Sequence, residues 1–185
     1  YIRAKEVLIS SGSIERPLVF GNNDTPGVML SSAAKEYLKV YGVLVGKKPL
    51  IFTNNDSGYE TAIEFKKNGV DPIILDTRKE PKSEIIDEAK KLDIQIKFSY
   101  VVVAAKGYKK VKSAEVAKIS DDKNELGTLE NINCDCICVS GFWTPTIHLA
   151  SQSGNKTTFN KDIDAFVPGL SKQNETTLGA ANGTF

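Results

Sequence analysis

The residues with the clearest chemical potential lie in a polar turn between two apolar runs. The turn, residues 53–58, reads TNNDSG and follows the apolar run at residues 50–52. A helix that begins after such a turn presents free backbone N–H groups and the positive end of its dipole, which together attract a phosphate. A second apolar run ends in Asp76, about twenty residues further on, where an acid can hydrogen-bond a ribose hydroxyl. This layout is typical of a dinucleotide-binding βαβ unit.

The turn departs from the glycine pattern G-x-G-x-x-G that such units usually carry. Thr53 and Asn55 stand at the first two glycine positions, and only Gly58 remains. Asparagine tolerates a left-handed backbone better than most residues, so Asn55 could still make the turn, although its side chain would crowd the space of a pyrophosphate. The residues therefore leave two readings open: a nucleotide-binding unit, or a βαβ unit that has kept its shape and lost its ligand.

Composition and charge exclude several classes of partner. The 185 residues carry a net charge of +1, with 41% hydrophobic and 25% charged residues, which is ordinary for a globular protein. A net charge this small creates no strong electrostatic attraction to nucleic acid or to a membrane surface. No apolar run approaches the length of a membrane span. We expect neither partner. The lack of a disulfide framework fits a reducing compartment, so we expect a cytoplasmic location.

Three cysteines and one histidine are the other candidates for chemistry. On a strand, the sulfurs of Cys134, Cys136 and Cys138 would point to one face about 6.6 Å apart. Two thiolates on one zinc ion lie at most about 4.6 Å apart, so we expect no metal site and buried, free cysteines. The single histidine, His148, is expected to begin a helix at or near the surface. We assign no catalytic residue.

The hydrophobic pattern predicts an α/β fold with a Rossmann-like parallel sheet. Short continuous apolar runs indicate buried strands, and apolar positions three and four apart indicate helices. Expected strands are at residues 7–9, 50–52, 73–75, 94–98 and 134–140, and expected helices at residues 31–43, 59–70 and 85–92.

Two later stretches break this alternation. Three strand-like runs without helices predict an antiparallel meander at residues 100–105, 111–119 and 127–132, with turns at residues 106–107 and 121–124. A loop, residues 141–145 (GFWTP), is expected at the carboxyl end of the last strand, where open α/β sheets bind ligands. The tail at residues 152–172 is expected to be irregular and polar.

Several segments resemble one family of flavoproteins. The segments at residues 8–17 and 139–145 are similar to the two crossovers by which a glutathione-reductase-type flavoprotein leaves its FAD domain for an inserted NAD domain and returns. A finer resemblance is to the alpha subunit of heterotetrameric sarcosine oxidase and its opine oxidase and hydrogen cyanide synthase relatives. It rests on GSIERPLVFGNNDTPGVML, IFTNNDSGYETA, VSGFWTPTIHLASQSG and LGAANG, in that order along the chain.

The resemblance implies a fold, an activity and a set of cofactors. The fold would be the NAD-binding domain of an FAD/NAD-linked reductase. The parent complex would oxidatively demethylate sarcosine to glycine, forming hydrogen peroxide and methylene-tetrahydrofolate. Its alpha subunit would bind NAD, with FAD in the beta subunit, FMN between alpha and beta, and further gamma and delta subunits. The tetrahydrofolate site would lie in a domain that this sequence does not include.

Site residues follow from the resemblance where positions match. The pyrophosphate turn would be lined by Thr53, Asn54, Asn55, Asp56, Ser57 and Gly58. Asp76 would take the adenosine ribose, with Arg78 beside it, and the acid favours NAD over NADP. The far side of the nucleotide would be flanked by Gly141, Phe142 and Trp143.

The resemblance also predicts the domain organisation. Residues 1–46 would flank a larger FAD-type domain, residues 47–140 would form the inserted NAD-binding domain, and residues 141–185 would return to the FAD-type domain. The first residue is Tyr1, so we expect a piece of a longer polypeptide, an oxidoreductase in its parent complex and inactive in isolation. Two alternatives stay open: a nicotinamide-dependent amine or opine dehydrogenase domain, and a ligand-free scaffold for subunit assembly.

Overall fold

The computed structural model describes residues 3–120 and 125–185, and these residues form two compact units. The sheet unit is Arg16–Phe142, and the strand-pair unit comprises residues 3–15 and Trp143–Phe185. The turn expected at residues 121–124 lies outside the described residues.

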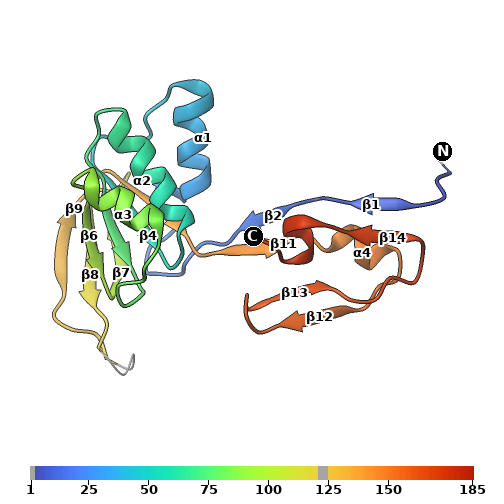
Figure 1. Ribbon diagram of the computed structural model, residues 1–185. Coiled ribbons are helices and arrows are strands. Elements are labelled where there is room, and N and C mark those ends of the chain that lie inside the picture. Colours follow the sequence, from blue (N-terminus) through green and yellow to red (C-terminus); the bar gives the residue numbers. More distant parts are fainter. Residues whose placement is uncertain (1–2, 121–124) are drawn as a thin grey trace. The chain divides into compact units, whose positions relative to one another are not determined.

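The sheet unit is built on five parallel strands in the order β3-β10-β4-β5-β6. Figure 1 labels β4 and β6 among them. Their bounds are β3 Val28–Leu30, β10 Cys136–Ser140, β4 Pro49–Thr53, β5 Ile73–Asp76 and β6 Gln95–Phe98. The register aligns the last residues of the three central strands, because Thr53 of β4 is opposite both Ser140 of β10 and Asp76 of β5. The polar residues that end these strands therefore meet at one edge of the sheet.

Both faces of this sheet are covered. Ile51 of β4 packs into the cluster beneath the helices, whereas Leu50 and Phe52 pack into the cluster on the opposite face. All five residues of β4 are buried, as are all five of β10. A parallel strand buried on both sides needs a continuous apolar run, which explains why these segments show no polar alternation.

Three helices cover one face of the sheet, and they are α1 Ser31–Tyr41, α2 Ser57–Lys67 and α3 Glu84–Lys91. Gly42 ends α1 in the left-handed conformation (φ 64°), and its N–H donates to the carbonyl of Leu38. The expected helices at residues 31–43, 59–70 and 85–92 are all confirmed, with ends that differ by at most three residues from those predicted.

An antiparallel meander covers the other face, and it consists of β7 Tyr100–Lys106, β8 Ser113–Lys118 and β9 Glu130–Asn133. Val102, Val116 and Val111 bring its apolar side into the same cluster as Phe52 and Leu75 of the parallel sheet. The predicted combination of a Rossmann-like sheet and a three-stranded meander is therefore confirmed.

The strand-pair unit contains three two-stranded sheets. Strand β1 Val7–Ile9 pairs in parallel with β14 Glu175–Thr177, β2 Ser13–Glu15 pairs antiparallel with β11 Trp143–Pro145, and β12 Thr157–Asn160 pairs antiparallel with β13 Ala165–Pro168. The helix α4 His148–Gln152 and the 3₁₀ turn η1 Gly179–Asn182 complete it.

Four features of the elements differ from or go beyond the expectations. The tail at residues 152–172 is not irregular, since it contains the β12–β13 hairpin. The rings of Phe159 and Phe166 pack edge to face across this hairpin, with their centroids 5.3 Å apart. The GFWTP segment is not wholly a loop, since Trp143 begins β11. Residues 28–30, for which no element was expected, form the edge strand β3. The strand at residues 7–9 was expected to be buried, but Val7 and Leu8 are exposed.

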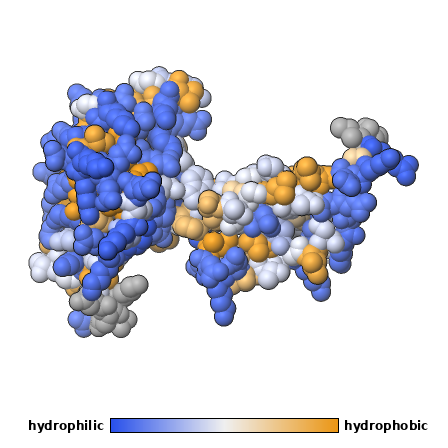
Figure 2. All heavy atoms as spheres, viewed as in Figure 1, coloured by the Kyte–Doolittle hydropathy of each residue, from blue (hydrophilic) through white to orange (hydrophobic). Residues whose placement is uncertain are grey.

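Polar side chains dominate the visible face of each unit, and apolar ones form separate patches (Figure 2). One apolar group lies on α1, where Tyr37 and Tyr41 are 47% and 66% exposed and their rings are 5.9 Å apart. Within residues 3–120 and 125–185, no helix combines the length and the hydropathy that a membrane crossing requires.

Candidate functional site

The turn between β4 and α2 is held by its own side chains. The Thr53 hydroxyl accepts a hydrogen bond from the N–H of Asn55 (3.1 Å), and Asn55 Oδ1 accepts one from the N–H of Ser57 (2.8 Å). The N–H of Asn54 donates to the carbonyl of Ser140 on β10 (3.3 Å). Three N–H groups of the turn, which in a glycine-rich loop would be available to a phosphate, therefore already have partners inside the protein.

Asn55 also ties the turn to the neighbouring strand. Its side chain is 6% exposed and its Nδ2 donates to the carbonyl oxygen of Ser140 (3.1 Å) and to Asn54 Oδ1 (2.9 Å). Asn55 is not among the residues with positive φ, so the expected use of its tolerance for a left-handed backbone was wrong. Its contribution is the side-chain amide, whose oxygen accepts from the N–H of Ser57 at the start of α2 and whose nitrogen donates to Ser140 at the end of β10.

Gly58 is required by a close approach between α2 and β4. A Cβ at this position would lie 2.7 Å from Cβ of Thr53 and 2.8 Å from its Oγ1, and Thr53 is fully buried. Gly58 therefore lets the first turn of the helix pack against the end of the strand, which is the helix–strand packing role of the last glycine in the usual pattern.

The acid at the end of β5 is enclosed. Asp76 is 0% exposed, and its Oδ2 accepts hydrogen bonds from the Tyr59 hydroxyl (2.7 Å) and from Nη2 of Arg78 (2.8 Å). Its Oδ1 accepts from the backbone N–H of Arg78 (2.9 Å) and from Nε of the same residue (3.0 Å). A carboxylate has about four acceptor positions. All of them are filled in this structure by Tyr59 and Arg78.

The Arg78 side chain joins two acids from different elements. Its Nη2 lies 2.8 Å from Oδ1 of Asp56, the residue that precedes α2, as well as 2.8 Å from Oδ2 of Asp76 at the end of β5. The guanidinium is 29% exposed and the Asp56 side chain 43%. Both carboxylates raise the pKa of Arg78, although burial acts in the opposite direction. A fixed positive charge thus bridges the turn and the second strand.

Tyr59 is a member of this network that the sequence reasoning treated only as core. Tyr59 is fully buried, with 0% of its surface exposed. Burial raises the pKa of its hydroxyl, and the hydrogen bond to Asp76 and the charge of that carboxylate raise it further. The available signal was spacing: Tyr59 lies in the first turn of a helix that begins beside the end of the strand carrying Asp76. Ser140 was also missed, and its position at the end of the strand next to β4 could have indicated it.

The remaining predicted site residues divide between the units. Gly141 and Phe142 end the sheet unit, where the Gly141 N–H donates to the carbonyl of Arg16 (2.7 Å) and a Cβ would lie 2.6 Å from that oxygen. Phe142 has φ 87°, and its ring lies 6.0 Å from the Arg16 guanidinium carbon. Trp143 belongs to the strand-pair unit. The structure therefore gathers residues 53–58, Asp76 and Arg78 around one strand edge.

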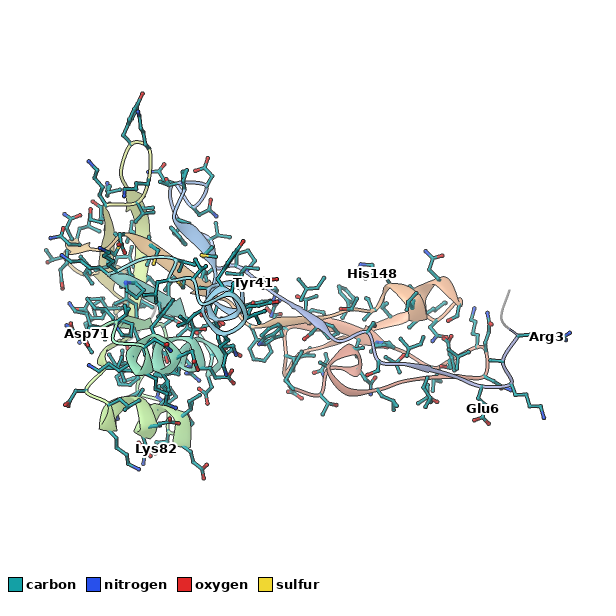
Figure 3. The ribbon with its side chains drawn as sticks, turned by 90° about the horizontal axis from the view of Figure 1, so that it is seen from above. Arg3, Glu6, Tyr41, Asp71, Lys82 and His148 are labelled. Atoms are coloured by element: carbon teal, nitrogen blue, oxygen red, sulfur yellow. The ribbon has the colours of Figure 1, made fainter. Side chains whose placement is uncertain are left out.

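The cysteines are buried and free, as predicted, but they do not share a face. Cys136 and Cys138 lie in the cluster beneath the helices, whereas Cys134, which precedes β10, lies in the cluster with the meander. Burial, together with the neighbouring Cys136 and Asp135, raises the pKa of the Cys134 thiol to about 12. His148 begins α4 and is exposed, as expected (Figure 3). Among the described residues, no group of three His, Cys, Asp or Glu side chains could hold a metal ion.

Solved structures with the same fold include a thioredoxin reductase and an L-proline dehydrogenase. The chain is 18% identical to thioredoxin reductase from T. acidophilum, with a TM-score of 0.76 over 98% of this chain and 59% of that one. It is 20% identical to L-proline dehydrogenase from P. horikoshii, with a TM-score of 0.62 over 96% of this chain and 30% of that one. These similarities establish the fold of an FAD/NAD-linked reductase. No family model matches the chain.

Curated relatives are closer in sequence. The chain is 34% identical over its whole length to sarcosine oxidase subunit alpha from Corynebacterium sp. strain P-1, of which it covers 19%. It is 38% identical, over 99% of its length, to sarcosine oxidase subunit alpha from Rhizobium meliloti strain 1021, of which it covers 18%. The chain thus spans about one fifth of the length of these relatives. Over nearly its whole length, the chain is therefore similar to one segment of these longer alpha subunits.

Proposed function

We propose that this chain is the dinucleotide-binding segment of an oxidoreductase related to sarcosine oxidase, and that NAD is its nucleotide. The observation that carries the proposal is the arrangement at the carboxyl edge of β4 and β5, within a chain 34% identical to a sarcosine oxidase alpha subunit. A helix N-terminus and a charged bridge, Asp56–Arg78–Asp76, lie together at the edge where open α/β sheets bind ligands.

The role of this chain's residues is binding and orientation. The first turn of α2, with its dipole directed at the edge of the sheet, supports the pyrophosphate. The charged bridge at the end of β5 lies on the side where the adenosine half would extend. A bound nicotinamide or flavin would supply the redox chemistry, and no residue of this chain is assigned to that step.

The wider setting is part of the same proposal. In the longer protein, the sheet unit, residues 16–142, would bind NAD, and the strand-pair unit, residues 3–15 and 143–185, would belong to an FAD-type domain. This shifts the expected domain boundary at residues 46–47 to the start of the sheet unit. The whole complex would demethylate sarcosine with formation of hydrogen peroxide and methylene-tetrahydrofolate. It would contain FAD and FMN and further beta, gamma and delta subunits, in the cytoplasm. The bound NAD would be resident and would not carry electrons.

One observation favours a second candidate, a ligand-free scaffold for subunit assembly. The turn donors of Asn54, Asn55 and Ser57 are engaged internally, so the usual phosphate loop is partly closed by side chains. The exposed aromatic pair of Tyr37 and Tyr41 on α1, at which Figure 3 labels Tyr41, would then be a contact surface.

One measurement separates the candidates. The full-length protein is purified and denatured, and the released nucleotide is identified and counted by mass spectrometry, before and after incubation with sarcosine. About one NAD per subunit that sarcosine does not reduce is the expected result. NAD that becomes NADH during turnover would replace this proposal with a nicotinamide-dependent dehydrogenase. Absence of any nucleotide would favour the scaffold.

A further inference from the structure

The acid at the end of β5 has no acceptor position left for a ribose. Asp76 is 0% exposed, and Tyr59 and Arg78 occupy both of its oxygens with five hydrogen bonds of 2.7 to 3.2 Å. For a ribose hydroxyl to bind there, the guanidinium would have to leave a buried carboxylate. Removing one partner of such a pair is costly, because the other charge stays buried without compensation.

The neighbouring acid is in a different position. Asp56 Oδ1 has almost no accessible surface and lies 2.8 Å from Nη2 of Arg78. The side chain as a whole is 43% exposed. Its other carboxylate oxygen therefore accounts for the polar part of that exposure, next to a guanidinium that is itself 29% exposed.

We infer that Asp56 and Arg78, and not Asp76, bind the hydroxyls of the adenosine ribose, and that Asp56 is the residue that excludes the 2′-phosphate of NADP. The inference rests on the proposed function, since it concerns the same nucleotide. A ribose diol both donates and accepts hydrogen bonds, so one hydroxyl can donate to the Asp56 carboxylate while the other accepts from Arg78. A 2′-phosphate in the same place would face the exposed oxygen of Asp56 and be repelled.

Asp76 and Tyr59 then act as positioning residues. The buried carboxylate of Asp76 fixes Nε and Nη2 of Arg78, and the hydroxyl of Tyr59 fixes the carboxylate. A ribose-binding role also explains why Asp56 lies inside a phosphate-binding turn, where a negative charge is otherwise unfavourable. The ion pair with Arg78 holds the Asp56 carboxylate toward β5, on the ribose side of the turn.

The test measures nucleotide preference in the full-length protein. Apoprotein freed of nucleotide is incubated with equimolar NAD⁺ and NADP⁺, and the bound nucleotides are counted by mass spectrometry for the wild type and for Asp56→Asn, Asp76→Asn and Asp71→Asn. The amide in Asp56→Asn keeps an acceptor for Arg78 but removes the charge. Asp71 is a matched exposed acid that precedes β5, at the opposite edge of the sheet.

We expect Asp56→Asn to lower the ratio of bound NAD to NADP by about tenfold or more, because a like-charge repulsion is removed. Asp71→Asn should leave the ratio unchanged, and the folded fraction of Asp76→Asn should keep the wild-type ratio. A collapse of the ratio in Asp76→Asn with no change in Asp56→Asn would overturn the inference, and so would an equal loss of both nucleotides in Asp56→Asn. If the wild type binds NAD and only these ratios fail, the proposed function stands. If it binds neither nucleotide, both fall.

Discussion

The Tyr59 hydroxyl donates a hydrogen bond of 2.7 Å to Oδ2 of Asp76, and both side chains are 0% exposed. Tyr59 belongs to α2 and Asp76 to β5, so this bond joins the helix that follows the turn to the strand beside it. The two residues thus form a buried polar contact beside the apolar cluster that lies beneath the helices. In the described part of the chain, the only other side chain that hydrogen-bonds to the Asp76 carboxylate is that of Arg78.

Replacing Tyr59 by Phe should lower the free energy of unfolding by about 1–3 kcal/mol, because a buried carboxylate loses one hydrogen bond and keeps its charge. Urea denaturation of the wild type and the variant measures the difference. Tyr37→Phe is the matched control, since Tyr37 is 47% exposed, and it should change stability by no more than about 0.5 kcal/mol. Equal midpoints for the Tyr59 variant and the wild type would contradict the structure.

Gly58→Ala should destabilise the protein, although alanine is the better helix former by about 1 kcal/mol. The new Cβ would lie 2.7 Å from Cβ of the buried Thr53, and such overpacking typically costs about 1–3 kcal/mol. Thr53→Gly removes that contact, so the double variant should lose less stability than the sum of the two single variants. A double-mutant cycle by thermal or urea denaturation measures this coupling. Additive effects would show that the contact is not the cause.

Cys134 should make stability depend on alkaline pH. Its pKa is about 12 in the folded protein, against about 8.5 for an unfolded cysteine, so the native state keeps the proton longer. The contribution is therefore fully present below about pH 8.5 and is lost as the pH rises toward 12, with a slope of at most about 1.4 kcal/mol per pH unit. Urea unfolding at pH 7.5, 8.5 and 9.5 tests it. The decline should be shallower in Cys134→Ala, and an unchanged slope in that variant would assign the decline to other groups.

Asn55→Gly should cost about 1–2 kcal/mol of stability, because the variant loses a cap of α2 and the bond to Ser140. Asn23→Gly, in an exposed turn of the same unit, is the control for the entropy of an added glycine. In the full-length protein, Asn55→Gly should also alter NAD retention, because it frees the N–H of Ser57. Unchanged stability and unchanged retention would together remove Asn55 from the site.

The sequence predicted the layers of the sheet unit because its elements are strongly patterned. Continuous apolar runs at β4 and β10 indicate strands buried on both faces, and the four-residue spacing of Ala34 and Leu38 indicates α1. Short strands were less predictable. Strand β3 has three residues, and hairpin β12–β13 is held by the aromatic pair of Phe159 and Phe166, a contact between residues seven positions apart.

The residues of the candidate site were predictable, but the hydrogen bonds and ion pairs between them were not. Residues 53–58, Asp76 and Arg78 could be placed at one edge from strand and helix patterns alone. The pattern gave no indication that the Arg78 side chain would turn back onto Asp76, or that Tyr59 would cover the same carboxylate. Such contacts depend on rotamers and on the distance between α2 and β5, which follow from packing and not from sequence spacing.

The strand order has a consequence for biosynthesis. Strand β10 lies between β3 and β4, although it follows both of them in the chain by more than eighty residues. As the polypeptide leaves the ribosome, β3 has no partner within the parallel sheet until residues 136–140 have been made. Long-range pairing of this kind slows folding and leaves apolar edges exposed in the meantime. A nascent chain stalled after β9 should therefore be protease-sensitive, and release of β10 should mark the moment when the sheet closes.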